Sequence, residues 1–145
     1  MRPAIILYIS LLSGFTSCKK DKPAKSELQA MIACSMTKKL DSTAITATLN
    51  GSWIWKKQSI ANTSEFRNAD KDIKVTFNAD STFSLTENSN ITMHFTLKLI
   101  YHRENEYSIR TDQYNQYVGG FVYFCDNQLL LVNSFVDGVD NLFEK

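Results

Sequence analysis

Apolar and polar residues alternate through residues 73–101, which read IKVTFNADSTFSLTENSNITMHFTLKLIY. Alternation with a period of two is typical of a β-strand that buries one face. The polar run Asn78-Ala79-Asp80-Ser81 interrupts the first alternation with residues that favour a turn. The clearest strand covers residues 91–101, where one face carries Ile91, Met93, Phe95, Leu97, Leu99 and Tyr101. We therefore predict three successive strands joined by polar turns in this stretch.

The same alternation extends in both directions along the chain. An Asn50-Gly51 turn signal opens a strand that continues through Trp55, and Tyr107 and Ile109 resume the pattern after residue 101. Residues 116–125 and 128–134 are apolar on both faces, and a last short strand ends at Phe143. An antiparallel meander of about eight strands closes into a barrel because closure removes exposed edges. We predict an all-β fold, an eight-stranded antiparallel up-and-down barrel; a two-sheet sandwich is the competing architecture.

Composition is that of one globular domain without a nucleic-acid partner. The chain has 145 residues, 43% of them hydrophobic, and a formal net charge of +1. Phosphate binding requires clustered Lys and Arg, and the sequence has no basic run. Every aromatic residue after Cys18 lies at or beyond Trp53, which separates an N-terminal tether from a packed domain.

A short helix is predicted just before the first strand. Ser26 and Gln29 match a capping box. One helical face then carries an apolar stripe, formed by Leu28, Met31, Ile32, Met36 and Leu40. On this helix Cys34 points away from the stripe, which argues against a disulfide to the domain.

The N-terminal segment is predicted to be a secretory signal over residues 1–17. Arg2 provides a positive start, and an apolar run covers residues 4–12. This run is about nine residues, well short of the ~20 that a membrane-spanning helix needs. Export therefore explains the segment better than a membrane span does.

The end of this segment, Ser17-Cys18-Lys19-Lys20, resembles the signal of bacterial lipoproteins, and envelope lipoproteins of the Bacteroidetes in particular. The resemblance implies cleavage before Cys18 and attachment of diacylglycerol and fatty acyl chains such as palmitate to that residue. Acyl chains contribute ~0.8 kcal/mol per buried CH2, enough to hold a protein at a membrane. We expect export to the cell envelope and anchoring to the outer membrane.

Domain boundaries follow from this interpretation. Residues 1–17 are the signal peptide, residues 18–48 are the tether with the N-terminal helix, and residues 49–145 are the barrel domain. Loss of Arg2 with the signal brings the net charge of the remaining chain to zero.

Lipidation of Cys18 leaves two cysteines in an oxidising compartment. Cys34 and Cys125 are predicted to form a disulfide, although the helical phase of Cys34 counts against it. Closing a loop of ~90 residues would contribute about 4 to 5 kcal/mol by the chain-entropy model.

Gly51-Ser52-Trp53 on the first strand resembles the opening signature of lipocalins. Residues 75–83 and 137–145 resemble the second hairpin and terminal strand of the small lipocalin-like domains in Bacteroidetes lipoproteins. The resemblance implies that Trp53 packs across the closed end of the barrel. An eight-stranded barrel either fills with side chains or holds one small ligand. The predicted inward set is Trp53, Trp55, Val75, Phe77, Phe83, Leu85, Met93, Phe95, Leu97, Leu99, Tyr107 and Ile109.

No constellation of catalytic residues is evident. His94 and His102 share a strand face, but eight residues at ~3.3 Å each separate them by about 26 Å. They cannot share a metal ion. The chain has no Gly-x-Ser-x-Gly element, and its carboxylates fall mostly in turns. We expect no enzyme activity, no metal and no cofactor.

Two functional hypotheses follow. The first is a membrane-anchored envelope lipoprotein that acts as a non-catalytic binding module for a small apolar ligand. Its predicted ligand-binding residues are Trp55, Phe77, Phe83, Phe95, Leu97 and Tyr107. The second is a structural or protein-interaction lipoprotein with a filled barrel, whose partner is another envelope protein.

Overall fold

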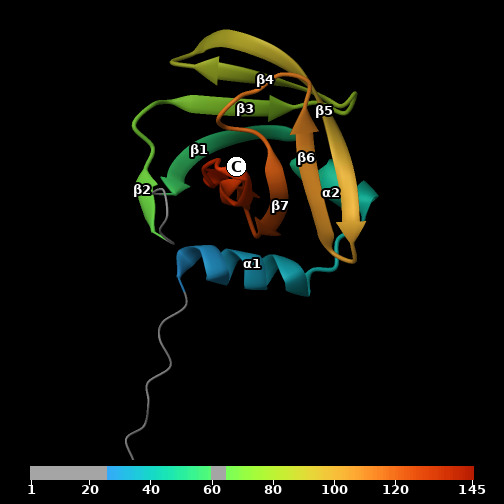
Figure 1. Cartoon of the computed structure of the whole chain (residues 1–145). Helices are drawn as coiled ribbons and strands as arrows, with labels where there is room; N and C mark the ends of the chain where they lie inside the picture. The colour runs from blue at the N-terminus through green and yellow to red at the C-terminus, as the bar shows by residue number, and fades with distance from the viewer. Residues whose placement is uncertain (1–25, 60–64) are drawn as a thin grey trace, which may run out of the picture.

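The computed structural model describes residues 26–59 and 65–145, which form a closed antiparallel β-barrel of eight strands with two short helices (Figure 1). The prediction of an all-β, lipocalin-like up-and-down barrel is confirmed. The predicted signal over residues 1–17, Cys18 and the start of the tether lie outside the described residues.

The barrel strands follow one another around the ring in chain order, and a short extra strand, β2, pairs with the end of β1. Pairing of β1 with β9, in which Trp55 lies opposite Phe143, closes the ring. The strands are β1 (Gly51–Ser59), β2 (Phe66–Asn68), β3 (Ile73–Phe77), β4 (Thr82–Glu87), β5 (Asn90–Arg103), β6 (Glu106–Thr111), β7 (Gly120–Cys125), β8 (Gln128–Val132) and β9 (Asn141–Glu144). The helices are α1 (Glu27–Thr37), α2 (Ser42–Leu49) and a 3-10 turn, η1 (Ser134–Val136).

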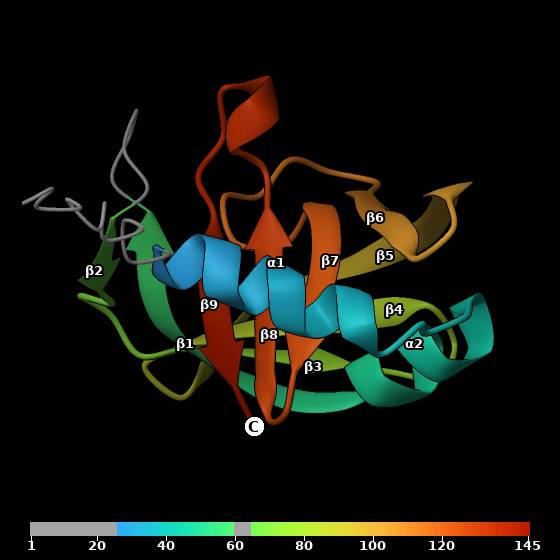
Figure 2. The ribbon, with the colours of Figure 1, turned by 90° about the horizontal axis from the view of Figure 1, so that it is seen from below.

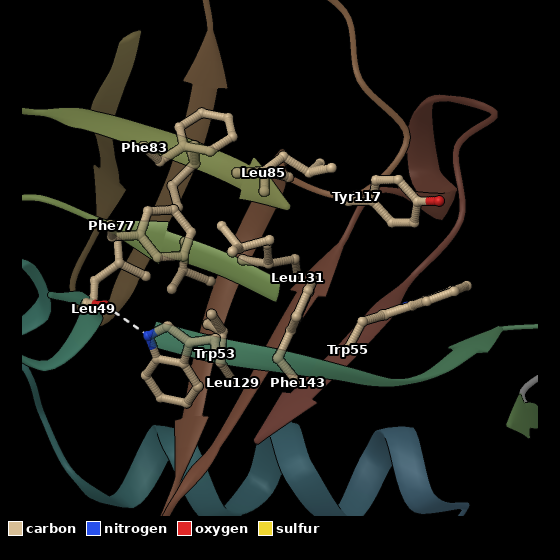
Figure 3. Packing of buried hydrophobic residues seen from close by; sticks show 14 of the residues in the cluster. Leu49, Trp53, Trp55, Phe77, Phe83, Leu85, Tyr117, Leu129, Leu131 and Phe143 are labelled. Carbon is tan, nitrogen blue, oxygen red and sulfur yellow. Dashed lines mark hydrogen bonds between the residues drawn. The ribbon is translucent and has the colours of Figure 1, made fainter. Parts of the chain in front are cut away.

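Side chains fill the barrel interior (Figure 3). Trp53 is 1% exposed, and its indole Nε1 donates a hydrogen bond to the carbonyl oxygen of Leu49 over 2.6 Å. The Lys145 ammonium lies 4.7 Å from the Trp53 ring centroid and donates to the carbonyl oxygens of Thr48 and Asn50. Trp53 therefore joins the first strand, the end of α2 and the last residue of the chain.

Most of the predicted inward residues face this core, and Met93 is the exception. Its side chain is 54% exposed, although it lies opposite the buried Leu85 in the pairing of β4 with β5. The register of this pair shifts between Leu85 and Thr86. Such a bulge bends and twists a strand, so alternation alone misplaced Met93 near this end of β5.

Helix α1 lies across the outer face of β7, β8 and β9 (Figure 2). Its capping box at Ser26 and Gln29 is present, as predicted. Met31 packs against Tyr123, Leu130 and Leu142, all on the outer face of the barrel. This cover explains why the sequence of these strands is apolar on both faces.

The predicted apolar stripe of the helix is wrong at its C-terminal end. Met36 is 41% exposed, and Leu40 follows the end of α1 at Thr37. Cys34 and Ser35 lie on the sheet side instead. Ser35 Oγ accepts a hydrogen bond from the Phe124 backbone N–H over 3.0 Å.

The predicted disulfide between Cys34 and Cys125 is confirmed, with Cα atoms 5.7 Å apart. The expectation that Cys34 points away from the domain is wrong, because the contact surface of α1 is rotated toward residues 31, 34 and 35. The bond fastens a regular helix to the end of β7.

Helix α2 was not predicted. Asp41 caps it by accepting the Ala44 backbone N–H over 2.8 Å, and Ile45 and Leu49 are buried in the barrel core. Its Ser- and Thr-rich sequence has modest helix propensity, so burial of these two side chains stabilises it.

Gly119 immediately precedes β7 and Gly120 is its first residue, with φ angles of +155° and +84° respectively. A Cβ atom on Gly120 would overlap the carbonyl oxygen of Val132. The two glycines therefore allow the chain to turn sharply into β7 and approach β8 closely.

Removing the disulfide tests how far it stabilises this fold. We expect the double variant Cys34→Ala, Cys125→Ala to lose about 4 to 5 kcal/mol of unfolding free energy, because the bond closes a loop with a sequence separation of 91. Guanidinium denaturation followed by circular dichroism measures this loss. Unaltered protein under reducing conditions is the matched control, and a loss below about 1 kcal/mol contradicts the expectation.

Candidate functional site

A groove of about 540 Å³ opens between α2 and the neighbouring strands β5 and β6 at the rim of the barrel. We call it the α2 groove. Its lining residues are Ser42, Thr43, Thr46, Ala47, Asn50, Ala79, Leu99, Tyr101 and Tyr107. A cavity of about 50 Å³ adjoins it, sharing Thr46, Asn50 and Leu99 and adding Phe77 and Leu97.

One wall of the α2 groove is apolar and aromatic. Leu99, Tyr101 and Tyr107 form it, and the two tyrosine rings lie with their centroids 5.4 Å apart. Tyr107 is 8% exposed, whereas Tyr101 is 63% exposed. The wall therefore runs from a buried ring to one at the surface.

The opposite wall is helix α2, which is less polar than its composition suggests. The hydroxyl of Thr46 donates to the carbonyl oxygen of Ser42 over 2.8 Å, within the helix. Such a bond satisfies the Thr46 hydroxyl locally, so the groove combines an apolar strand wall with a few uncharged polar residues, Ser42, Thr43 and Asn50. This combination is typical of sites for small molecules.

The structure brings five of the six predicted ligand-binding residues to one part of the barrel. Tyr107 lines the α2 groove, and Phe77 and Leu97 line the adjoining cavity. Phe83 packs on Phe77 at 5.6 Å between ring centroids and stacks on Phe95 at 4.8 Å. These last two rings support the wall from within the core.

Trp55, the sixth, lies elsewhere. Its ring packs edge-on against Tyr117 with centroids 5.2 Å apart, away from Phe77 and Phe83 (Figure 3). Its indole Nε1 donates to Asn141 Oδ1 over 3.0 Å. Asn141 is 2% exposed, and its Nδ2 donates to the carbonyl oxygens of Gln116 and Tyr117. Trp55 is thus part of a buried hydrogen-bonded network.

Sequence reasoning missed the α2 side of the groove. Residues 42–48 were assigned to the tether, although Asp41 followed by Ser42 and Thr43 is a signal for a helix start. Tyr101 was placed on the apolar face of its strand but not in the predicted inward set, and its position at the rim of the barrel could not be predicted from alternation.

Hydrogen bonds, burial and neighbouring charges shift the pKa values of several side chains among the described residues. The hydroxyl and backbone N–H of Thr82 hold the pKa of Asp80 below its usual value. A hydrogen bond from Lys71 to Glu87 raises the pKa of Lys71. Burial, followed by the charge of Glu106, raises the pKa of Tyr123. All three side chains lie outside the α2 groove.

His94 and His102 are both exposed on β5, and His102 Nε2 lies 2.8 Å from Ser108 Oγ. Within residues 26–59 and 65–145, no three His, Cys, Asp or Glu side chains are arranged to hold a metal ion. None of the helices in these two ranges is long and apolar enough to cross a membrane.

Comparison of the chain with protein-family models, curated proteins and solved structures finds no match. A small β-barrel of this kind is compatible with a binding module.

Asn141 offers a test of the network around Trp55. We expect Asn141→Ala to lower the free energy of unfolding by about 2 to 4 kcal/mol, because it leaves a buried indole N–H and two carbonyl oxygens without a partner. Denaturant unfolding measures the loss. The exposed Asn68→Ala should stay within about 0.5 kcal/mol of the unaltered protein. Equal effects of the two substitutions would contradict the assignment.

Proposed function

We propose that the protein is an exported, lipid-anchored envelope lipoprotein that acts as a non-catalytic binding module for a small apolar ligand at the α2 groove. The observation that carries this proposal is the groove itself, which has a volume of about 540 Å³. In it an apolar wall of strand residues faces helix α2. Volumes of about 300 to 1,000 Å³ are typical of small-molecule sites.

The chemistry of the groove favours a ligand with little charge. Its strand wall offers Leu99 and two tyrosine rings, and the hydroxyl of Thr46 is already bonded within its helix. Burying apolar ligand surface here contributes about 25 cal/mol per Å² removed from water. A flat or linear hydrocarbon group with one polar end matches such a groove, because its polar end can stay at the exposed Tyr101.

The lipid anchor is supported by the sequence around Cys18. The tether between Cys18 and Ser26 would leave the barrel beside the membrane, within reach of apolar molecules that partition there. The absence of a convergent acid, base and nucleophile in the sequence supports a binding role over a catalytic one.

The filled interior supports the second candidate, a structural or protein-interaction lipoprotein without a small ligand. Phe83, Leu129 and Leu131 are fully buried inside the barrel, which leaves the rim as the place for binding (Figure 3). Titration with an apolar probe distinguishes the two candidates.

A neutral fluorescent probe tests the α2 groove. The chain from Lys19 onward contains every described helix and strand, and it is titrated with N-phenyl-1-naphthylamine without detergent. We expect saturable enhancement of probe emission, and a Kd at least about tenfold weaker in Ala47→Trp, because the indole fills the groove.

Ala30→Trp on the exposed face of α1 is the matched control, and its Kd should stay within about twofold of the unaltered chain. Absence of saturation across a panel of apolar probes would favour the filled-barrel candidate. Equal affinity of the unaltered chain and Ala47→Trp would remove the α2 groove as the site.

Mass spectrometry of the protein made in a bacterial host tests the anchor. We expect the unaltered chain to begin at an acylated Cys18, and Cys18→Ser to retain residues 1–17, since lipoprotein processing needs the cysteine thiol. Cys125→Ser serves as the control and should be processed normally. Normal cleavage of Cys18→Ser would contradict the lipoprotein proposal.

A further inference from the structure

A second groove, of about 460 Å³, opens where strands β6 and β7 separate. The two strands pair at Ser108 with Phe121 and at Ile109 with Gly120. Beyond these positions β6 remains paired with β5 as far as Thr111, while residues 112–119 leave the sheet as a loop. We call this opening the β6–β7 groove.

Aromatic rings line one side of the β6–β7 groove in a row. Phe121 lies between His102 and Phe135, with ring centroids 5.0 and 4.8 Å away respectively. Phe135 is 56% exposed, and Tyr114, across the groove, is 88% exposed. Two large aromatic side chains thus face water at the rim of the same groove. Exposing their apolar surface to water is unfavourable, and burial in the core does not offset that cost.

Phe135 lies on a turn that hydrogen bonds to Asp140 hold together. Asp140 is 2% exposed, and its Oδ1 accepts hydrogen bonds from the backbone N–H groups of Asn133 and Ser134, each over 2.9 Å. Its Oδ2 accepts from the Ser134 hydroxyl over 3.0 Å. These bonds fix η1, which lies between the end of β8 and the start of β9 (Figure 2).

Tyr114 is held by the loop that follows β6. Asn115 Oδ1 accepts the backbone N–H groups of Tyr117 and Val118 over 3.1 and 2.6 Å. The Thr111 hydroxyl donates to the carbonyl oxygen of Gln113 over 2.7 Å. The backbone that carries both exposed rings is therefore held by hydrogen bonds, which reduces the entropy lost when a ligand binds.

Planar polar side chains complete the lining of the groove. Arg110 is exposed, and within the described part of the chain its guanidinium forms no ion pair or side-chain hydrogen bond. It lies directly opposite Lys98, a like-charge pairing that costs stability. Asp112 also lines the groove, and its Oδ1 accepts the Thr96 backbone N–H over 3.1 Å. The groove therefore offers hydrogen-bond donors and acceptors with charges of both signs.

We propose that the β6–β7 groove binds a sugar ring of an oligosaccharide. A pyranose presents an apolar C–H face, which packs on an aromatic ring, and a rim of hydroxyls, which each donate and accept hydrogen bonds. Phe135 and Tyr114 supply the faces, while Arg110 and Asp112 supply a donor fork and an acceptor for neighbouring hydroxyls.

Addition of a peptide strand fits the same opening less well. The part of β6 that extends past its pairing with β7 consists of Arg110 and Thr111, which is too short for a stable ladder. The exposed rings also lie on the loop and on η1 rather than along a strand edge. A sugar ring can contact both the exposed aromatic rings and the polar side chains of the groove.

The test uses the full chain purified in mild detergent on an array of neutral, amino-sugar and uronate-containing oligosaccharides, followed by calorimetric titration of the bound glycans. We expect saturable binding of at least one glycan with a Kd between ~10 µM and ~1 mM. Tyr114→Ala and Phe135→Ala should each weaken it about tenfold. Arg110→Gln should weaken it severalfold.

Met93→Ala is the control, since Met93 is 54% exposed and lines neither groove. It should bind glycans as the unaltered chain does, and unfolding midpoints show that each variant is folded. Failure of every glycan to bind, or unchanged affinity in both Tyr114→Ala and Phe135→Ala, would overturn the proposal. The naphthylamine titration reports on the α2 groove separately, so failure of one proposal is distinguishable from failure of the other.

Discussion

Closure of the sheet between β1 and β9 is the constraint on which the rest of the structure depends. Strand β1 pairs with β3 along its first half, with β2 at its end and with β9 on its other side. Residue 145, one position beyond β9, then reaches the carbonyl oxygens of Thr48 and Asn50 and the face of Trp53. Closure therefore fixes the end of α2, and the position of α2 creates the α2 groove.

The strands could be predicted from sequence because their signal is local. Alternation located most strands of the barrel, and β7 and β8 were predicted from runs that are apolar on both faces. What covered the outer face could not be read, because it depends on how α1 is rotated. The helix turns Cys34 and Ser35 toward β7, while Met36 remains 41% exposed. A weak amphipathic pattern did not determine that rotation; the disulfide and the contact with the Phe124 backbone favour it.

The candidate sites were less predictable than the fold. Alternation identified Phe77, Leu97 and Tyr107 as inward-facing, and all three contribute to the α2 groove or to its adjoining cavity. It could not show that a helix of marginal propensity would form the second wall. Trp55 was grouped with these residues by periodicity, but its indole N–H is bonded to Asn141, 86 positions away in sequence. Long-range polar contacts of this kind leave no pattern in a single strand.

The filled interior explains why both proposed sites lie at the rim. Emptying enough of the core to admit a ligand would resemble several large-to-small substitutions at residues such as Phe83 and Leu131, each costing about 2 to 5 kcal/mol. A domain of this size has only about 5 to 15 kcal/mol of net stability. Binding inside the barrel would therefore compete with folding. Surfaces made by α2, η1 and the loop after β6 avoid this conflict, because the closed core holds them in place without giving up its own contacts.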